Sequence, residues 1–99
     1  MIKIFRTPEF IEWLLEQTEK SKVQIDDRLS KIQDEEHFGV HRFVGDESAE
    51  VWELKWKNGR RVYYAYVPES QIMVLFGGVK NAQNKDIKTA KRIFNKYIE

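Results

Sequence analysis

Apolar residues recur at helical spacing in three stretches of the chain. The first stretch follows Thr7 and Pro8, a typical cap and first-turn pair, and predicts a helix that runs to about residue 21. The spacing predicts two further helices, at about residues 23–36 and 84–98. Their apolar stripes are Phe10, Ile11, Leu14 and Leu15, then Ile25, Leu29 and Ile32, then Ile87, Ala90, Ile93, Phe94 and Tyr97. We expect the first two helices to pack as an antiparallel pair.

The segments between the helices carry the composition and alternation that are typical of β-strands. Strands are expected at residues 1–5, 40–44, 51–57, 60–67 and 71–76. Asn58-Gly59 joins the third and fourth strands as a hairpin, and Pro68-Glu69-Ser70 turns the chain into the fifth. There is no linker, repeat or low-complexity segment, so residues 1–99 predict a single α+β domain.

The length of the hairpin loop decides which side chains share a face of the sheet. A two-residue loop would place Arg61 on the face of the tryptophans, whereas a three-residue loop pairs Lys55 with Arg61. Burying an arginine among aromatic residues is costly, so the three-residue loop is favoured. It leaves an apolar face for the helices, formed by Trp52, Leu54, Val62, Tyr64 and Tyr66. We expect the other face to be cationic and open to a ligand, with Glu53, Lys55, Arg61 and Tyr63 on it.

Charge is distributed unevenly along the chain. Residues 1–50 hold 7 Lys/Arg and 12 Asp/Glu, a balance of −5, and residues 51–99 hold 10 and 4, a balance of +6. A cationic face for an anionic partner is therefore compatible with a net charge of only +1, as is a set of scattered surface charges. With no cysteine, and with His37 and His41 too few for a zinc site, no metal or cofactor is expected. No signal peptide or membrane-spanning run is visible, so we expect a cytoplasmic protein.

Three motifs of the second half resemble one known group of proteins. They are residues 52–55 (Trp-Glu-Leu-Lys), 59–65 (Gly-Arg-Arg-Val-Tyr-Tyr-Ala) and 77–87 (Gly-Gly-Val-Lys-Asn-Ala-Gln-Asn-Lys-Asp-Ile). In this order the motifs resemble the RelE/ParE superfamily of toxins, and more closely its phage-derived addiction module killer protein branch, which includes HigB-like toxins. Lys55 stands where that branch has an arginine, and Val79 where it has an aspartate.

The resemblance implies a RelE-like fold, in which a helical pair packs on a small antiparallel sheet. It also implies the toxin of a type II toxin–antitoxin system, with a cognate antitoxin, for example of the helix-turn-helix type, as its partner. Many relatives cut mRNA on the ribosome, whereas ParE-like members inhibit DNA gyrase. An mRNA endoribonuclease, a gyrase inhibitor and a non-catalytic antitoxin-binding protein are therefore the alternatives.

For RNA cleavage through the 2′-hydroxyl, a site needs a base, cations around the phosphate and an acid for the leaving oxygen. Arg61 is the candidate for binding the phosphate, Lys55 and Lys80 for charge and proton transfer, and Glu53 for the base. Residues expected to contact RNA around them are Lys57, Arg60, Gln83 and Lys85. The structural alternatives are a surface ion pair for Glu53 and Lys55 and a helix cap for Gln83.

Overall fold

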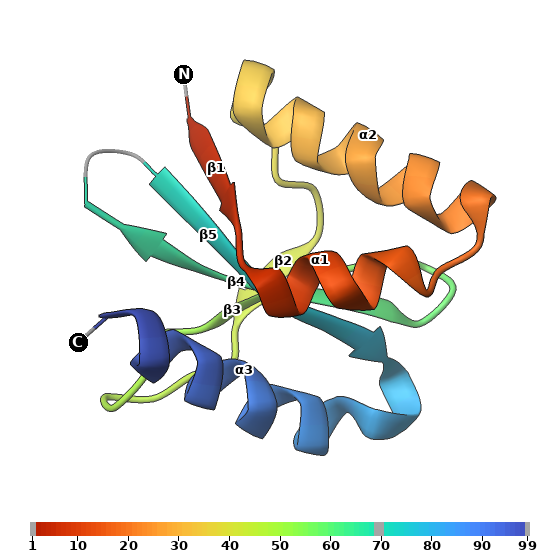
Figure 1. The fold of residues 1–99 in the computed structure, drawn as a ribbon. Coiled ribbons are helices and arrows are strands. Elements are labelled where there is room, and N and C mark those ends of the chain that lie inside the picture. Colours follow the sequence, from red (N-terminus) through yellow and green to blue (C-terminus); the bar gives the residue numbers. More distant parts are fainter. Residues whose placement is uncertain (1, 69–70, 99) are drawn as a thin grey trace.

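The computed structural model describes residues 2–68 and 71–98, and it is an α+β fold built on one five-stranded sheet. The strand order is β1-β5-β4-β3-β2, with α1 and α2 on one face and α3 on the other (Figure 1). The elements in chain order are β1 (Lys3–Arg6), α1 (Pro8–Leu15), α2 (Glu19–Glu35), β2 (His41–Phe43), β3 (Trp52–Lys55), β4 (Arg60–Val67), β5 (Gln71–Val79), the 3-10 turn η1 (Lys80–Ala82) and α3 (Gln83–Ile98). An antiparallel sheet was expected, but β1 runs parallel to β5, so the sheet is mixed.

The two N-terminal helices are divided differently from the prediction. Thr7 caps α1 as expected, because its Oγ1 accepts the Phe10 N–H and also donates to backbone carbonyls of β5. α1 ends at Leu15 rather than near residue 21, because Thr18 caps a new helix through the Ser21 N–H. α1 and α2 run in roughly opposite directions over the same face, as predicted (Figure 1). α2 ends at Glu35, and Glu36 caps it in the left-handed backbone conformation (φ 54°).

Each face of the sheet has its own apolar core, and the predicted helical stripes supply both. The core beneath α1 and α2 contains Phe10, Ile25, Leu29, Ile32, Leu54, Val62 and Tyr64. The core beneath α3 contains Val51, Tyr63, Ala65, Leu75, Ala90 and Ile93. Arg28 of α2 ties the first layer to the sheet, since its guanidinium donates to the carbonyls of Phe38, Val40 and Lys55 and lies 4.4 Å from the Trp56 ring centre.

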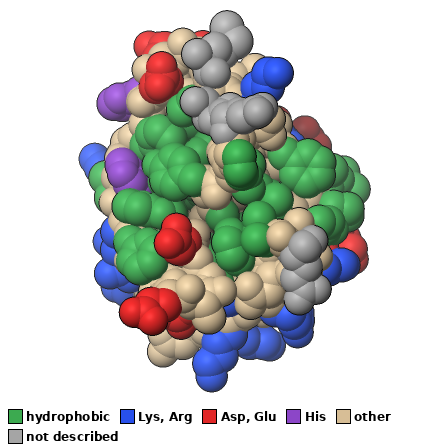
Figure 2. All heavy atoms as spheres, turned by 90° about the vertical axis from the view of Figure 1, so that its left-hand side faces the viewer, with side chains coloured by type: hydrophobic (Ala, Val, Ile, Leu, Met, Phe, Trp, Pro, Cys, Tyr) green, Lys and Arg blue, Asp and Glu red, His purple; other side chains and the backbone are tan. Residues whose placement is uncertain are grey.

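An aromatic cluster continues the first core to the surface. Its members are Phe38, His41, Phe43, Trp52, Tyr64 and Tyr66, whose contacting rings have centres 5.3–6.1 Å apart. Figure 2 shows hydrophobic side chains gathered on this side of the molecule, with the two histidines at the rim. None of the helices in residues 2–68 and 71–98 is long and apolar enough to cross a membrane.

The hairpin has the predicted three-residue register. Lys55 pairs with Arg61, the Trp56 N–H donates to the Arg60 carbonyl at 3.0 Å, and Gly59 has a positive φ of 92°. β4 has the predicted bounds, whereas β3 is shorter than predicted at its C-terminal end. The turn predicted at residues 68–70 lies mostly outside the described residues, since 69 and 70 are not part of them.

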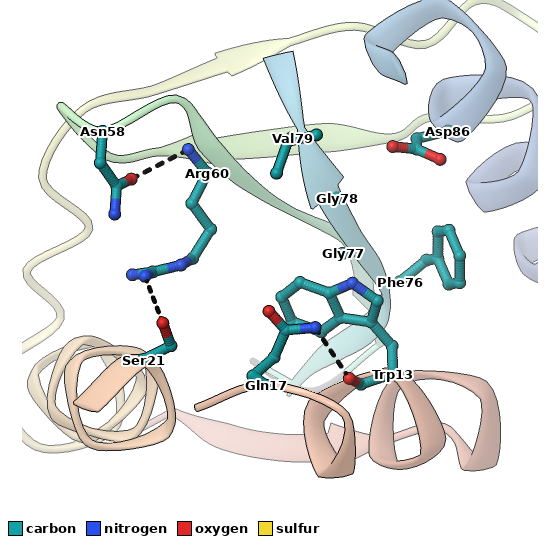
Figure 3. Close-up of a pocket in the computed structure, with 10 residues that line it drawn as sticks. All are labelled: Trp13, Gln17, Ser21, Asn58, Arg60, Phe76, Gly77, Gly78, Val79 and Asp86. Atoms are coloured by element: carbon teal, nitrogen blue, oxygen red, sulfur yellow. Dashed lines mark hydrogen bonds between the residues drawn. The ribbon is translucent and has the colours of Figure 1, made fainter. Parts of the chain in front are cut away.

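A bulge in β5 sets the direction of its last residues. Tyr63 pairs with Phe76 and Tyr64 with Val74, so Leu75 is an extra residue in the ladder. As a result, Gly77 faces α1, where a Cβ would overlap the Trp13 ring, and Gly78 faces α3, where a Cβ would overlap the Asp86 carboxylate (Figure 3). The glycine pair thus lies inside a strand and allows one side chain on each side to approach the backbone closely.

Candidate functional site

The predicted polar residues meet on the α3 side of the sheet, where β3, β4 and β5 approach η1. Glu53 and Lys55 alternate along β3, and Arg61 of β4 pairs with Lys55 on one side and Gly78 on the other. Because alternate residues of a strand share a face, these side chains project toward the first turn of α3.

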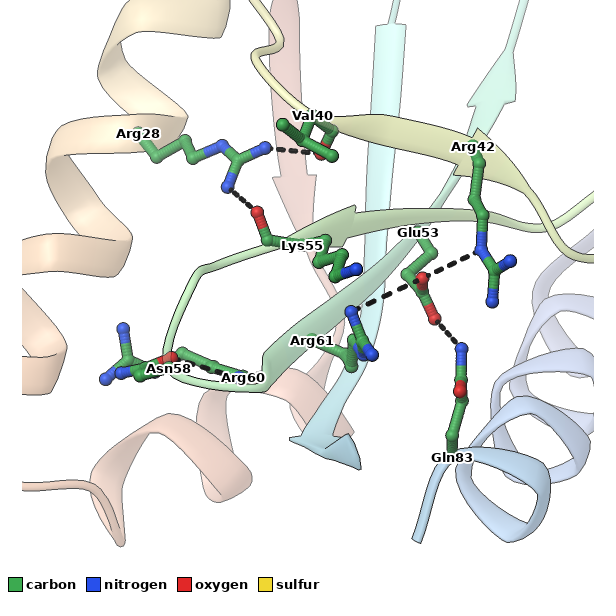
Figure 4. A network of polar contacts seen from close by, with 9 residues as sticks. All are labelled: Arg28, Val40, Arg42, Glu53, Lys55, Asn58, Arg60, Arg61 and Gln83. Atoms are coloured by element: carbon green, nitrogen blue, oxygen red, sulfur yellow. Dashed lines mark hydrogen bonds and ion pairs between the residues drawn. The ribbon is translucent and has the colours of Figure 1, made fainter. Parts of the chain in front are cut away.

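Glu53 is the centre of a polar network (Figure 4). Its side chain is fully buried, and its Oε2 accepts a hydrogen bond from Gln83 Nε2 at 2.7 Å. Its Oε1 accepts one from Arg42 Nε at 3.2 Å and lies 3.9 Å from Arg61 Nη1. A buried carboxylate requires such partners, so Glu53 holds together β2, β4 and the start of α3.

Arg61 is buried without satisfying its hydrogen-bonding groups. The residue is only 3% exposed, and neither Nε nor Nη1 has a hydrogen-bond partner among the described residues. The 3.9 Å separation from Glu53 makes an ion pair but is too long for a hydrogen bond. A guanidinium with free donors is suited to a phosphate, which it can bind through two parallel hydrogen bonds.

The expectation that this face is open to a ligand is wrong for its centre. Glu53, Arg61 and Tyr63 are all buried, because the first turn of α3, with Gln83 and Asp86, packs against the sheet there. Alternation along the strands predicted which residues share the face, but it carried no information about the helix that covers them.

Exposed cations surround the buried centre. Lys80 in η1 and Lys57 in the hairpin loop line one shallow hollow, and Lys80, Gln83 and Lys85 line another beside it. Lys55 and Arg42 are also exposed, on β3 and β2. The structure therefore brings seven of the eight predicted site residues to one end of the α3 face.

Arg60 is the exception, because it projects from the opposite face. It is 8% exposed and donates to Gln24 Oε1 at 3.0 Å and to Ser21 Oγ at 2.8 Å. Its guanidinium lies 5.6 Å from the Trp56 ring centre, and burial lowers its pKa. Arg60 is thus separated by the sheet from Arg61, its neighbour in sequence.

Three polar residues of this region were not predicted as site residues. Arg42 is placed by its pairing with Glu53 in the β2–β3 ladder, a register that the sequence alone did not define. The Tyr63 hydroxyl is buried without a hydrogen-bond partner among the described residues, and burial, followed by the charge of Glu53, raises its pKa. Burial also raises the pKa of Asp86. Within the described ranges, no group of three or more metal-binding side chains is present.

Comparison with known proteins identifies a family and a fold. The model of the family described as "Phage derived protein Gp49-like (DUF891)" matches residues 12–96. A mutant of the E. coli toxin RelE in the free state superposes with a TM-score of 0.68 and 12% identity, over 98% of this chain and 97% of that chain.

Two further structures have the same fold. The isolated E. coli RelE toxin gives a TM-score of 0.63 and 12% identity, over 87% of this chain and 95% of that one. A chain of the intact E. coli RelBE toxin–antitoxin complex gives a TM-score of 0.63 and 13% identity, over 78% of this chain and 94% of that one. No curated protein sequence matches the chain significantly.

Proposed function

Because the chain belongs to the Gp49-like family of phage-derived proteins and has a RelE-like fold, we propose that it is the toxin of a type II toxin–antitoxin pair. The activity that we propose for it is that of a ribosome-dependent mRNA endoribonuclease, which inhibits translation. The observation that carries the enzymatic part is the buried Arg61 guanidinium, whose Nε and Nη1 lack partners among the described residues. A group of this kind is suited to a phosphate that arrives with the substrate, and in this proposal the first turn of α3, which covers Arg61, moves aside to admit it.

In the proposed mechanism each residue has a distinct role. Arg61 binds the scissile phosphate and stabilises the charge that develops on its oxygens. Lys55 and Lys80 add positive charge beside it and carry the proton between the 2′-hydroxyl and the leaving 5′-oxygen. Glu53, whose two oxygens already accept from Arg42 and Gln83, is assigned as a positioning residue rather than the base.

The remaining predicted residues take a supporting role in this proposal. Lys57, Lys85 and Gln83 contact the RNA around the scissile phosphate, and Gln83 also joins α3 to Glu53. The cationic rim attracts the negatively charged RNA and ribosome. The proposed protein partner is a cognate antitoxin, in keeping with the toxin–antitoxin complex among the structural matches.

Primer extension on mRNA from cells that express the chain tests this proposal. Wild-type protein is expected to produce defined cuts that Arg61→Ala weakens by about 100-fold or more, the effect of removing one transition-state donor. Arg61→Lys, which keeps the charge but not the bidentate geometry, should lie between them. Arg92→Ala removes an exposed arginine on α3 and serves as the matched control.

Three outcomes would contradict the proposal. Equal cutting by wild type and Arg61→Ala would exclude Arg61 from the reaction. Intact mRNA together with double-strand breaks in DNA would favour the gyrase inhibitor, and unaffected growth without either would favour a non-catalytic antitoxin-binding protein.

A further inference from the structure

β2 forms an outer edge of the sheet that no other strand covers within residues 2–68 and 71–98. Its residues, His41, Arg42 and Phe43, are all exposed. An open edge presents unpaired main-chain groups to any extended chain that approaches it. β2 is therefore a place where a further strand can join the sheet.

The hydrogen bonds to β3 define which main-chain groups at this edge point outward. The segment around β2 bonds to β3 through the Val40 carbonyl, at 3.0 Å, and the Val44 N–H, at 2.9 Å. Because the pairing alternates along an antiparallel ladder, the N–H and C=O groups of His41 and Phe43 point away from β3. These groups make no hydrogen bond to the described residues, so they are available to a further strand.

One face of this edge is aromatic. His41 and Phe43 belong to the aromatic cluster, and their ring centres lie 5.7 Å and 5.5 Å from that of Trp52. Phe43 is 47% exposed, and Tyr66 of the same cluster is 48% exposed. Large apolar side chains that remain exposed together at an open edge are typical of an interaction surface.

The other face of the edge carries a positive charge. Arg42 points toward Glu53, and its Nε donates to Glu53 Oε1 at 3.2 Å (Figure 4). The Arg42 side chain is nevertheless 62% exposed, and its two terminal nitrogens make no hydrogen bond to the described residues. A carboxylate on a neighbouring strand would therefore find free guanidinium donors here.

We infer that the edge of β2 binds an extended segment of a partner protein in which an acidic residue lies between two apolar residues. The apolar residues lie opposite His41 and Phe43 and extend the aromatic cluster, and the acidic residue lies beside Arg42. The main chain of the segment bonds to the outward N–H and C=O groups of His41 and Phe43. This inference goes beyond the proposed RNA cleavage and does not depend on it.

A second copy of the chain fits this edge less well than an acidic partner. If two β2 strands paired antiparallel about their centres, Arg42 of each copy would lie directly opposite Arg42 of the other, and like charges in such a pair are destabilising. The sequence of β2, His-Arg-Phe, also offers no acid to place beside the arginine. The charge of the edge therefore favours a different chain.

Binding of a capped pentapeptide, Thr-Val-Glu-Val-Thr, to the intact protein tests the inference. Its sequence reads the same in both directions, so it suits parallel and antiparallel addition alike. We expect it to shift the amide resonances of His41 and Phe43 with a dissociation constant of about 1 mM or below, as about four main-chain hydrogen bonds of ordinary net strength would give. The matched peptide with Gln in place of Glu should bind about fivefold more weakly.

Variants of the protein separate the main-chain bonds from the charge. His41→Pro removes an N–H that β3 does not use, and proline is tolerated at such an edge position, so the fold should be kept. It should bind either peptide about tenfold more weakly than wild type, whereas His41→Ala, which keeps the N–H, should bind more tightly than His41→Pro. Arg42→Gln should bind the two peptides equally, and Arg92→Gln, at an exposed position of α3, should behave like wild type. Thermal unfolding checks that each variant is folded.

Several results would overturn the inference. One is the absence of any shift at His41 and Phe43, and another is peptide binding that His41→Pro leaves unchanged. Equal affinity of the wild-type protein for the two peptides would refute the acidic character of the partner. A concentration-dependent dimer that protects these amides, in place of peptide binding, would assign the edge to a second copy of the chain.

Discussion

Arg61 and Glu53 form a buried ion pair, and two methionine variants, Arg61→Met and Glu53→Met, test which member of the pair depends on the other. Glu53 keeps Arg42 and Gln83 as partners when Arg61 is removed, whereas Arg61 has only Glu53 as a counter-charge among the described residues. Each unpaired buried polar group costs about 1–3 kcal/mol, and Arg61 has two such nitrogens. Removing these two nitrogens offsets the lost attraction between Arg61 and Glu53 across 3.9 Å. The free energy of unfolding of Arg61→Met should therefore lie within about 1 kcal/mol of the wild-type value.

Glu53→Met should destabilise the fold far more, because it leaves the buried Arg61 guanidinium without a counter-charge. The expected loss is about 3–5 kcal/mol. Urea unfolding followed by tryptophan fluorescence measures both variants, and at about 1–3 kcal/mol per molar urea the Glu53 variant should unfold at least about 1 M earlier. Arg61→Met should meanwhile lose the proposed cleavage. If the two variants are destabilised equally, the ion pair is a mutual structural contact and the reasoning about the unpaired nitrogens is wrong.

Three further substitutions test other features. Gly78→Ala should destabilise by about 1–3 kcal/mol through overlap with the Asp86 carboxylate, and a double-mutant cycle with Asp86→Ala should recover most of that loss; strict additivity would contradict the contact. Glu36→Gly should stabilise by about 1 kcal/mol, since glycine adopts φ 54° without strain, and a lower melting temperature would show that the glutamate side chain compensates for it. Because burial raises the pKa of Asp86, the folded state binds its proton more tightly than the unfolded state, and stability falls as the pH rises through that raised pKa. Asp86→Asn should therefore raise the melting temperature at pH 7 but not below about pH 3.9, the ordinary aspartate value, and a gain independent of pH would contradict the shift.

The elements with local signals were predictable from the sequence. Thr7 and Pro8 defined the start of α1, and the turn chemistry of Asn58-Gly59, with the cost of burying Arg61 among tryptophans, gave the correct hairpin register. The end of α1 was missed because Thr18 acts as a cap, although helical spacing alone allowed the helix to continue. Local patterning therefore predicts which elements form better than it predicts where they end.

The features that depend on tertiary contacts could not be predicted in this way. The apolar run at residues 72–76 has no alternation, so nothing in it marked the bulge at Leu75 that turns Gly78 toward α3. Arg61 was placed on the correct face, but its burial depends on α3, which approaches from more than twenty residues away. Asp86 resembled an ordinary acid of a first helical turn, and only its place against Gly78 distinguishes it.

The parallel pairing of β1 with β5 has a consequence for biosynthesis. Ile4 is aligned with Ile72, so the first strand to leave the ribosome has no partner until most of the chain has been synthesised. Pairings so distant in sequence form late and slowly. The nascent chain therefore completes its sheet, and with it the surroundings of Arg61, only near the end of translation. Copies terminated before β5 lack the strand that joins β1 to β4 and are expected to be degraded rather than to act on the cell.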